Sequence, residues 1–192
     1  WSHDGEWLIF QDCLSESDPG HDWSDLMLSR PDGTNQRLLT QGQSLWFAAT
    51  YGTPDNRGSG SNVPVWSRDG SILYSRRHLN TKTPWEYQSN RPDVDHFNRD
   101  YKPELARGGT EICRMEPETG DVTRLTQSDP AVWDFRQVES SDAQHILFCR
   151  AETGSTSSIW IMDSDGKNQQ RLSTGIDDRG ADHPRWIPNT TE

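Results

Sequence analysis

Residues 66–74 read Trp-Ser-Arg-Asp-Gly-Ser-Ile-Leu-Tyr, and residues 1–10 read Trp-Ser-His-Asp-Gly-Glu-Trp-Leu-Ile-Phe. Both stretches join a Trp-Ser-x-Asp-Gly segment to a short apolar run. A weaker copy, Glu-Ser-Ser-Asp-Ala-Gln-His-Ile-Leu-Phe, occupies 139–148, and Trp186 opens a shortened fourth copy. Such internal self-similarity is the sequence signature of a repeat fold.

A second element follows each copy. Residues 25–40 contain Leu-Met-Leu, then Pro-Asp-Gly, then Arg-Leu-Leu-Thr, and segments 111–126 and 159–173 keep the same order. Asp-Gly pairs favour hairpin turns, since Gly tolerates the positive φ that tight turns require. The flanking runs are short, apolar and bounded by turn residues, which favours strands. No segment shows a sustained helical stripe, so we expect little helix.

Each unit therefore supplies about four antiparallel strands, the pattern of a propeller blade. We predict an all-β fold, a β-propeller with about three to four blades present. The whole chain, 1–192, forms one propeller segment with units at 1–40, 63–127, 131–174 and the start of another at 183–192. Because propellers have about 4–8 blades, we expect this segment to belong to a larger ring, completed by further sequence or by another chain.

The pattern Pro-x-Trp-Ser-x-Asp-Gly at 64–70, with Ile-Leu-Tyr after it and a closing Arg-Leu-Thr, resembles the TolB-type (WD40-like) propeller repeat. The resemblance implies the fold and names no ligand. TolB-like chains are associated with the bacterial periplasm, so the resemblance implies a periplasmic or secreted protein, with a cytoplasmic location left open.

Composition excludes several classes of protein. The chain has 192 residues, 30% of them hydrophobic, and a net charge of -11. Scattered basic residues and an acidic balance argue against a nucleic-acid partner. No apolar run is long enough for a membrane span. Three cysteines, Cys13, Cys113 and Cys149, fit no zinc spacing and lie in or beside apolar runs, so we expect buried free thiols.

Two insertions, 41–62 and 78–109, lengthen the repeats. Long loops within a compact domain are usually functional or disordered. The second insertion carries Trp85, Tyr87, His96 and Tyr101, and aromatic faces beside charged groups are typical of carbohydrate and peptide sites. We predict that these four residues contact a ligand. The alternative is a loop that caps one end of the propeller and packs its own aromatic rings.

A narrower resemblance concerns the oligogalacturonate lyases, which are propellers of the same type. Ile-Leu-Phe-Cys at 146–149 and His183-Pro184-Arg185-Trp186 are similar to segments of that family. The resemblance implies a divalent metal, Mn or Ca, bound by His183 in the channel. The alternative is that His183 is a packed or solvated channel histidine without a metal. Where the family has a further histidine this chain has Arg150, which could neutralise the carboxylate of a uronate ligand.

Three functions follow from these observations. The favoured one is a binding or scaffold module for a protein or an acidic oligosaccharide, since no nucleophile constellation or phosphate-binding loop is present in the sequence. The first alternative is a polysaccharide lyase, in which a metal or Arg stabilises a carboxylate while a base removes the α-proton. The second is the propeller domain of a larger peptidase. Neither nucleic-acid binding nor membrane insertion is expected.

Overall fold

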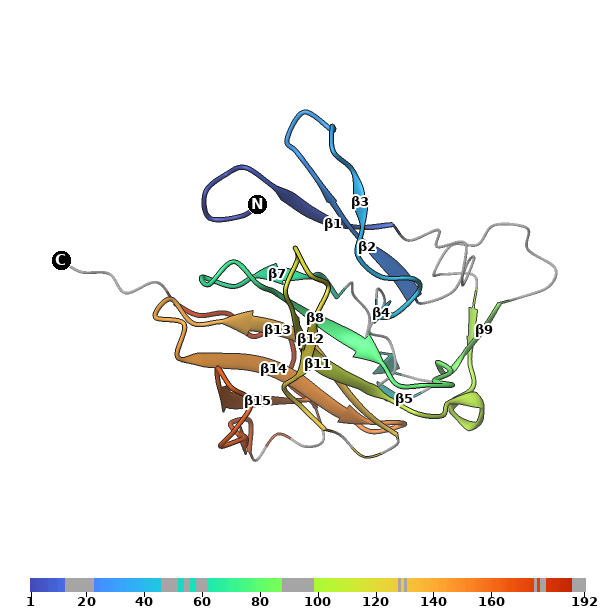
Figure 1. Ribbon diagram of the computed structural model, residues 1–192. Coiled ribbons are helices and arrows are strands. Elements are labelled where there is room, and N and C mark those ends of the chain that lie inside the picture. Colours follow the sequence, from blue (N-terminus) through green and yellow to red (C-terminus); the bar gives the residue numbers. More distant parts are fainter. Residues whose placement is uncertain are drawn as a thin grey trace.

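The computed structural model describes residues 1–12, 23–45, 52–53, 56–57, 62–87, 99–127, 129, 131–174, 176 and 179–187. These residues form sixteen strands and one 3-10 turn, η1, at Pro103–Leu105 (Figure 1). The all-β prediction is confirmed. Within the described ranges no helix is long and apolar enough to cross a membrane.

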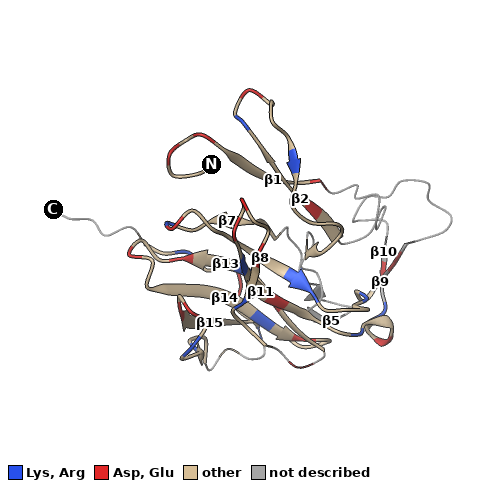
Figure 2. Cartoon of the chain, in the orientation of Figure 1, with Lys and Arg blue, Asp and Glu red and all other residues tan. Residues whose placement is uncertain are grey.

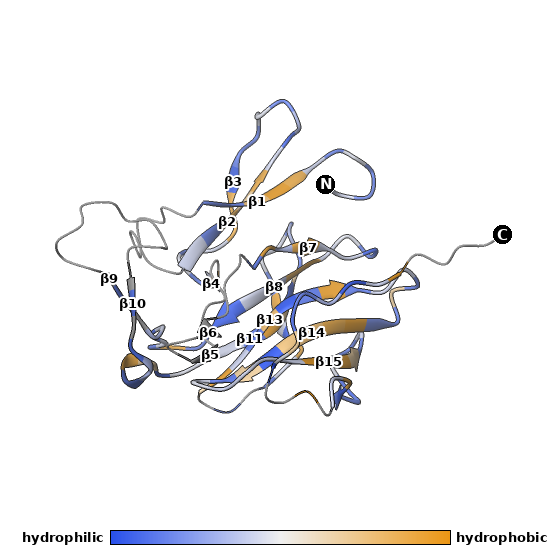
Figure 3. Cartoon of the chain, turned by 180° about the vertical axis from the view of Figure 1, so that it is seen from behind, coloured by the Kyte–Doolittle hydropathy of each residue, from blue (hydrophilic) through white to orange (hydrophobic). Residues whose placement is uncertain are grey.

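Twelve strands form one connected sheet, and eleven of them fall into three antiparallel sets that we call blades 1 to 3. In Figures 1 and 3 blade 2 lies between the other two. Blade 1 consists of β1 (Leu8–Asp12), β2 (Trp23–Ser29) and β3 (Arg37–Leu38). Blade 2 consists of β7 (Val65–Trp66), β8 (Ile72–Arg77), β11 (Thr110–Met115) and β12 (Val122–Arg124). Blade 3 consists of β13 (Val132–Glu139), β14 (His145–Glu152), β15 (Ser158–Asp163) and β16 (Gln170–Arg171).

Short contacts join the blades to each other. Strand β4 (Ser44–Leu45) pairs with β2 on one side and with β8 on the other, and β11 meets β13 in a parallel contact between Thr110 and Trp133. The path of paired strands runs from β1 to β16 and does not close into a ring. Two small hairpins stand apart from this sheet: β5 (Gly52–Thr53) with β6 (Asn56–Arg57), and β9 (Trp85–Tyr87) with β10 (Arg99–Tyr101).

The apolar residues of blade 2 are divided between two interfaces because side chains alternate along a strand. In β8, Ile72 and Tyr74 pack against Leu26 and Leu28 of blade 1. Leu73, between them, packs toward blade 3. In β11, Cys113 and Met115 join the blade 1 cluster, whereas Ile112 joins the blade 3 cluster with Ile146 and Phe148. Both faces of blade 2 are therefore buried. In Figure 3 the apolar colouring of β14 and β15 shows the strands of blade 3 that take part in this packing.

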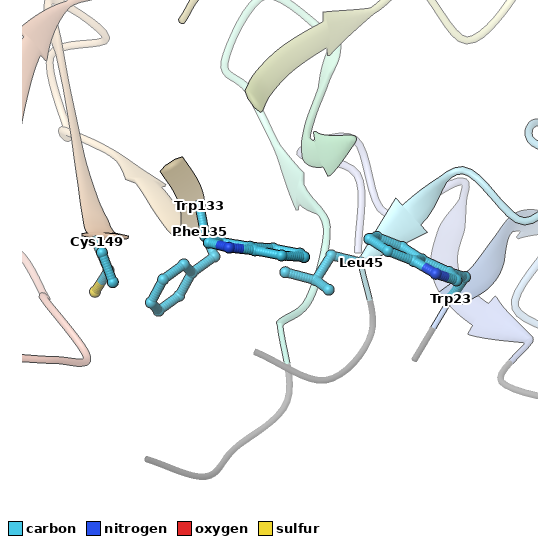
Figure 4. Packing of buried hydrophobic residues seen from close by; sticks show 6 residues of the cluster. Trp23, Leu45, Trp133, Phe135 and Cys149 are labelled. Atoms are coloured by element: carbon cyan, nitrogen blue, oxygen red, sulfur yellow. The ribbon is translucent and has the colours of Figure 1, made fainter. Parts of the chain in front are cut away.

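A third cluster joins the two outer blades through β4. Trp23 of β2 and Trp133 of β13 stack with ring centroids 6.4 Å apart. Figure 4 shows Leu45 between these two indoles, with Phe135 and Cys149 at the blade 3 end of the cluster. This cluster spans blades that do not pair directly, so it holds the arc together from one side.

The Asp-Gly turns form as predicted. Gly70 has φ +86°, its N–H donates to the Ser67 carbonyl, and the Asp69 carboxylate accepts from the Ser71 N–H (2.9 Å). The same carboxylate-to-amide bond, two residues along, occurs at Asp4, Asp32, Asp142 and Asp165. The aspartate thus replaces a backbone acceptor while the following residue takes the left-handed conformation.

Substitution of Gly166 would test how closely blades 2 and 3 pack. This glycine has φ +86°, and a Cβ at this position would overlap the backbone carbonyl of Leu125 in blade 2. Gly33, in the equivalent turn of blade 1, has φ +80° and open space around it. Gly33→Ala should cost about 1 kcal/mol from strained φ alone. Gly166→Ala should cost about 2–4 kcal/mol, since overpacking is added.

Urea unfolding of the two variants and the parent chain measures this difference. Gly33→Ala is the matched control, because it shares the turn and the φ but has no neighbour to clash with. Equal losses for the two variants would contradict the close contact between the Gly166 turn and blade 2.

Candidate functional site

Two residues near the starts of successive repeat units have an unusual backbone conformation. Arg136 in β13 has φ +54° and His183, three residues before Trp186, has φ +55°. The pairing of β13 with β14 shifts register between Phe135 and Val138, as in a β-bulge. Positive φ is uncommon for residues other than Gly and requires support from surrounding contacts.

That support is a chain of polar contacts among Asn62, Arg136 and Asp182, which we call the inner belt. The buried Asn62 donates from Nδ2 to the Leu45 carbonyl (3.0 Å), and its Oδ1 accepts the Arg136 N–H (2.5 Å). The Arg136 guanidinium pairs with the Asp182 carboxylate. The inner belt therefore links the segments at residues 62–66, 136–139 and 182–186, which begin three successive repeat units and which we call leading segments.

Burial determines the electrostatics of the inner belt. The Arg136 side chain is only 4% exposed, and that of Asp182 is 21% exposed. Asp182 Oδ1 also accepts from the His183 N–H (2.7 Å) and from the Cys149 thiol (3.1 Å). Burial, and then the neighbouring Asp182 charge, raise the pKa of Cys149, so this thiol stays protonated. Removing the carboxylate from a desolvated guanidinium is expected to destabilise the fold.

His183 is the exposed member of this region. Its side chain is 56% exposed, and Nδ1 lies 3.6 Å from Asp182 Oδ2. The residues that the structure describes contain no group of three or more His, Cys, Asp or Glu side chains placed to hold a metal ion. The predicted role of His183 as a metal ligand stays a prediction.

Arg150 lies on the other side of blade 3 from the inner belt. Its guanidinium donates to both carboxylate oxygens of Asp134, from Nε at 2.6 Å and from Nη2 at 2.8 Å. It also lies 4.7 Å from the centre of the Trp160 ring. Because Cys149, the preceding residue, faces the inner belt, alternation directs Arg150 toward blade 2. The structure does not bring Arg150 and His183 together.

The aromatic residues of the second insertion are placed only in part. Trp85 and Tyr101 are paired partners in the β9–β10 hairpin, and Tyr87 pairs with Arg99. These assignments concern the backbone alone. His96 lies outside the described residues. The ligand-binding role predicted for these four residues stays a prediction.

Sequence reasoning did not find Asn62, Arg136 or Asp182. The third repeat copy is degraded, so nothing marked Arg136 as the start of a leading segment. The one available signal was spacing: Arg136 stands three residues before Glu139 as His183 stands three before Trp186. The cysteine expectation is confirmed for Cys113 and Cys149, which are free and buried, while Cys13 lies outside the described residues.

The inner belt predicts a strong coupling between Arg136 and Asp182. Asp182→Ala leaves a buried guanidinium without its carboxylate, so the free energy of unfolding should fall by about 2–4 kcal/mol. Adding Arg136→Met should restore part of the loss, since the uncompensated charge is removed. Chemical unfolding of both single variants and the double variant measures the coupling.

The exposed pair Lys167–Asp165 supplies the control. Lys167→Ala should leave the unfolding midpoint unchanged within error, because exposed ion pairs contribute little. A double variant whose loss equals the sum of the two single losses would show that the two side chains are not coupled.

The comparisons with known proteins agree with the repeats. No protein-family pattern matches the chain. Over 83 residues it is 37% identical to "Tol-Pal system protein TolB 1" of Novosphingobium aromaticivorans, a match that covers 42% of this chain and 17% of that protein. The chain thus matches less than a fifth of this curated relative.

Solved propeller structures show more remote similarity. TolB from Acinetobacter baumannii is 16% identical with a TM-score of 0.32, over 88% of this chain and 53% of that one. Oligogalacturonate lyase from Vibrio parahaemolyticus is 13% identical with a TM-score of 0.38, over 90% and 50%. The chain spans about half the length of these solved chains. The resemblance to TolB-type propellers that the repeats indicate is confirmed, and the chain is an open, all-β arc of propeller blades.

Proposed function

We propose that the chain is a non-catalytic propeller module that binds a polypeptide at the surface formed by the leading segments, around Val63 and His183. The similarity to TolB, whose printed name places it in the Tol-Pal system, favours a role within a protein assembly. It also favours the periplasm as the compartment. Binding would then depend on a preformed surface, with the blades as a rigid support.

One observation carries this proposal: the predicted ligand residue Arg150 and the buried Arg136 are already paired with carboxylates within the chain. Arg136 is paired with Asp182, and Arg150 is held by both oxygens of Asp134. Neither guanidinium is presented to a uronate carboxylate as the lyase alternative requires. The net charge of -11 further disfavours an acidic oligosaccharide.

The groups that remain at this surface suit a polypeptide. His183 is exposed, and Val63 of the leading segment of blade 2 is 52% exposed. Gln137 donates to the Val63 carbonyl (3.0 Å), so the segment that carries this valine is fixed to blade 3. An exposed apolar group and an imidazole on a rigid backbone can bind a peptide without large loss of conformational entropy.

A displayed library of random peptides, selected on the folded chain, tests the proposal. We expect enriched peptides to bind with micromolar affinity in fluorescence anisotropy. His183→Ala and Val63→Ser should each weaken binding about fivefold, as expected for loss of a central contact. Leu79→Ser is the matched control, since Leu79 is 91% exposed and lies in blade 2.

Two results would overturn the proposal. The first is that the enriched peptides bind both site variants as tightly as the parent chain. The second is that incubation with oligogalacturonate yields shortened, unsaturated products, which would establish the lyase alternative.

A further inference from the structure

A pocket of about 360 Å³ opens between blades 1 and 2, beside their hairpin turns. Two indoles, Trp7 and Trp66, and the buried Leu28 side chain form its apolar wall. Asp4 and Asp69 line it from the Asp-Gly turns of the two blades. A concave apolar wall with a few charged groups is the usual form of a ligand site. None of these residues belongs to the inner belt.

The corresponding space between blades 2 and 3 is filled by an arginine of the chain itself. Arg114 donates to the Asp69 carboxylate (2.5 Å) and to the carbonyl of Ser164 (3.2 Å). Its Nη2 also lies 3.6 Å from Glu139 Oε1. The guanidinium thus ties the turn of blade 2 to two segments of blade 3.

The repeats relate the two spaces residue by residue. Leu28 near the end of β2 and Arg114 near the end of β11 each stand three residues before a proline. The residues of the filled space, Arg114, Asp69 and Glu139, correspond in the open pocket to Leu28, Asp4 and Trp66. The open pocket therefore has the equivalent aspartate, Asp4, but Leu28 in place of the arginine. The Trp66 indole stands where the filled space has the Glu139 carboxylate.

This chain combines guanidinium, indole and carboxylate groups in the same way at Trp7, on the wall of this pocket, and again in blade 3. Arg30 lies 4.1 Å from the centre of the Trp7 ring and forms an ion pair with Glu6 (2.7 Å). Arg150 makes the same combination with Trp160 and Asp134. Stacking on an indole while pairing with a carboxylate suits the planar, weakly hydrated guanidinium better than an ammonium.

Three carboxylates, Asp4, Asp69 and Glu118, line the pocket, and those of Asp69 and Glu118 are already paired with Arg114 and Arg37. Hydrogen bonds from the Ser2 hydroxyl and the Glu6 N–H lower the pKa of Asp4, so it is a carboxylate at neutral pH. Figure 2 shows acidic residues on the turn before β1 and on the β11–β12 hairpin, which frame this region. Arg68 and His3 also line the pocket and oppose a cationic ligand.

Trp66 provides a second sign of a missing partner. Its indole Nε1 is buried and has no hydrogen-bond acceptor among the described residues. A buried donor without a partner is costly. An arginine within a peptide also carries carbonyl oxygens that can accept from an indole N–H, whereas a free guanidinium or a simple cation carries none.

From this geometry we propose that the pocket between blades 1 and 2 binds an arginine side chain of a polypeptide. The guanidinium stacks on Trp66 and pairs with Asp4, in the position that Arg114 fills at the next interface. This site is separate from the proposed surface around His183, and it can exist whether or not that surface binds a peptide.

The test uses the full chain and three short peptides, acetyl-Gly-Xaa-Gly-amide with arginine, lysine or citrulline in the middle. Citrulline has nearly the same shape as arginine without the charge. We expect the arginine peptide to shift the Trp66 indole N–H signal in NMR titrations, identified by its absence in Trp66→Phe. Citrulline should bind at least about tenfold more weakly.

Two substitutions locate the site. Asp4→Asn should weaken arginine binding about fivefold to tenfold. Asp32→Asn, in the other Asp-Gly turn of blade 1 and outside the pocket lining, should have no effect, although Asp32 likewise accepts a backbone N–H and a hydroxyl hydrogen bond. Leu28→Arg should abolish binding, because it supplies the guanidinium from within as Arg114 does. Arg68→Ala should strengthen binding.

Equal binding of the citrulline and arginine peptides would overturn the proposal. So would unchanged binding by a Leu28→Arg variant whose circular dichroism and unfolding midpoint match the parent chain. If Leu28→Arg does not fold, the Asp4→Asn and Asp32→Asn pair decides the outcome. His183→Ala should leave arginine binding intact, which separates this site from the surface around His183.

Discussion

The two-residue alternation of side chains along β8 and β11 is the constraint on which the rest of the structure depends. It sends Ile72, Tyr74 and Met115 to one face of blade 2, and Leu73 and Ile112 to the other. Full burial of one such side chain contributes about 1.5–3 kcal/mol, so neither face can be left open without loss. A register slip of one residue would exchange the two faces.

Polar contacts fix how these apolar layers are arranged relative to one another. The inner belt joins three leading segments through Asn62, Arg136 and Asp182. On the turn side, Glu139 accepts the Arg68 N–H (2.9 Å) and lies near Arg114. Glu139 stands where the other repeats have tryptophan, so the departure from the repeat has a structural role. These charged side chains therefore help to hold the blades together.

The sequence predicted those parts of the fold that rest on local chemistry. Asp69-Gly70 and its equivalents mark turns because a carboxylate can accept the N–H two residues along, and the short apolar runs mark strands. The inner belt could not be predicted, since Arg136 and Asp182 lie 46 residues apart and no local pattern joins them. The Arg114 contacts, and the pocket that lacks them, depend likewise on which blades are neighbours. Arg150 was predicted as a site residue because it follows Cys149, but the alternation of side chains along β14 places the two on opposite faces.

Native-state hydrogen exchange, followed by mass spectrometry on the folded chain, tests the central claim that blade 2 is buried on both faces. Amides of β8 and β11 should exchange slowest, since their release requires both interfaces to open. Those of β3 and β16, at the outer edges of the sheet, should exchange much faster. Equal protection of β8 and β3, or protection that is greatest in blade 1, would contradict the arrangement of blades described above.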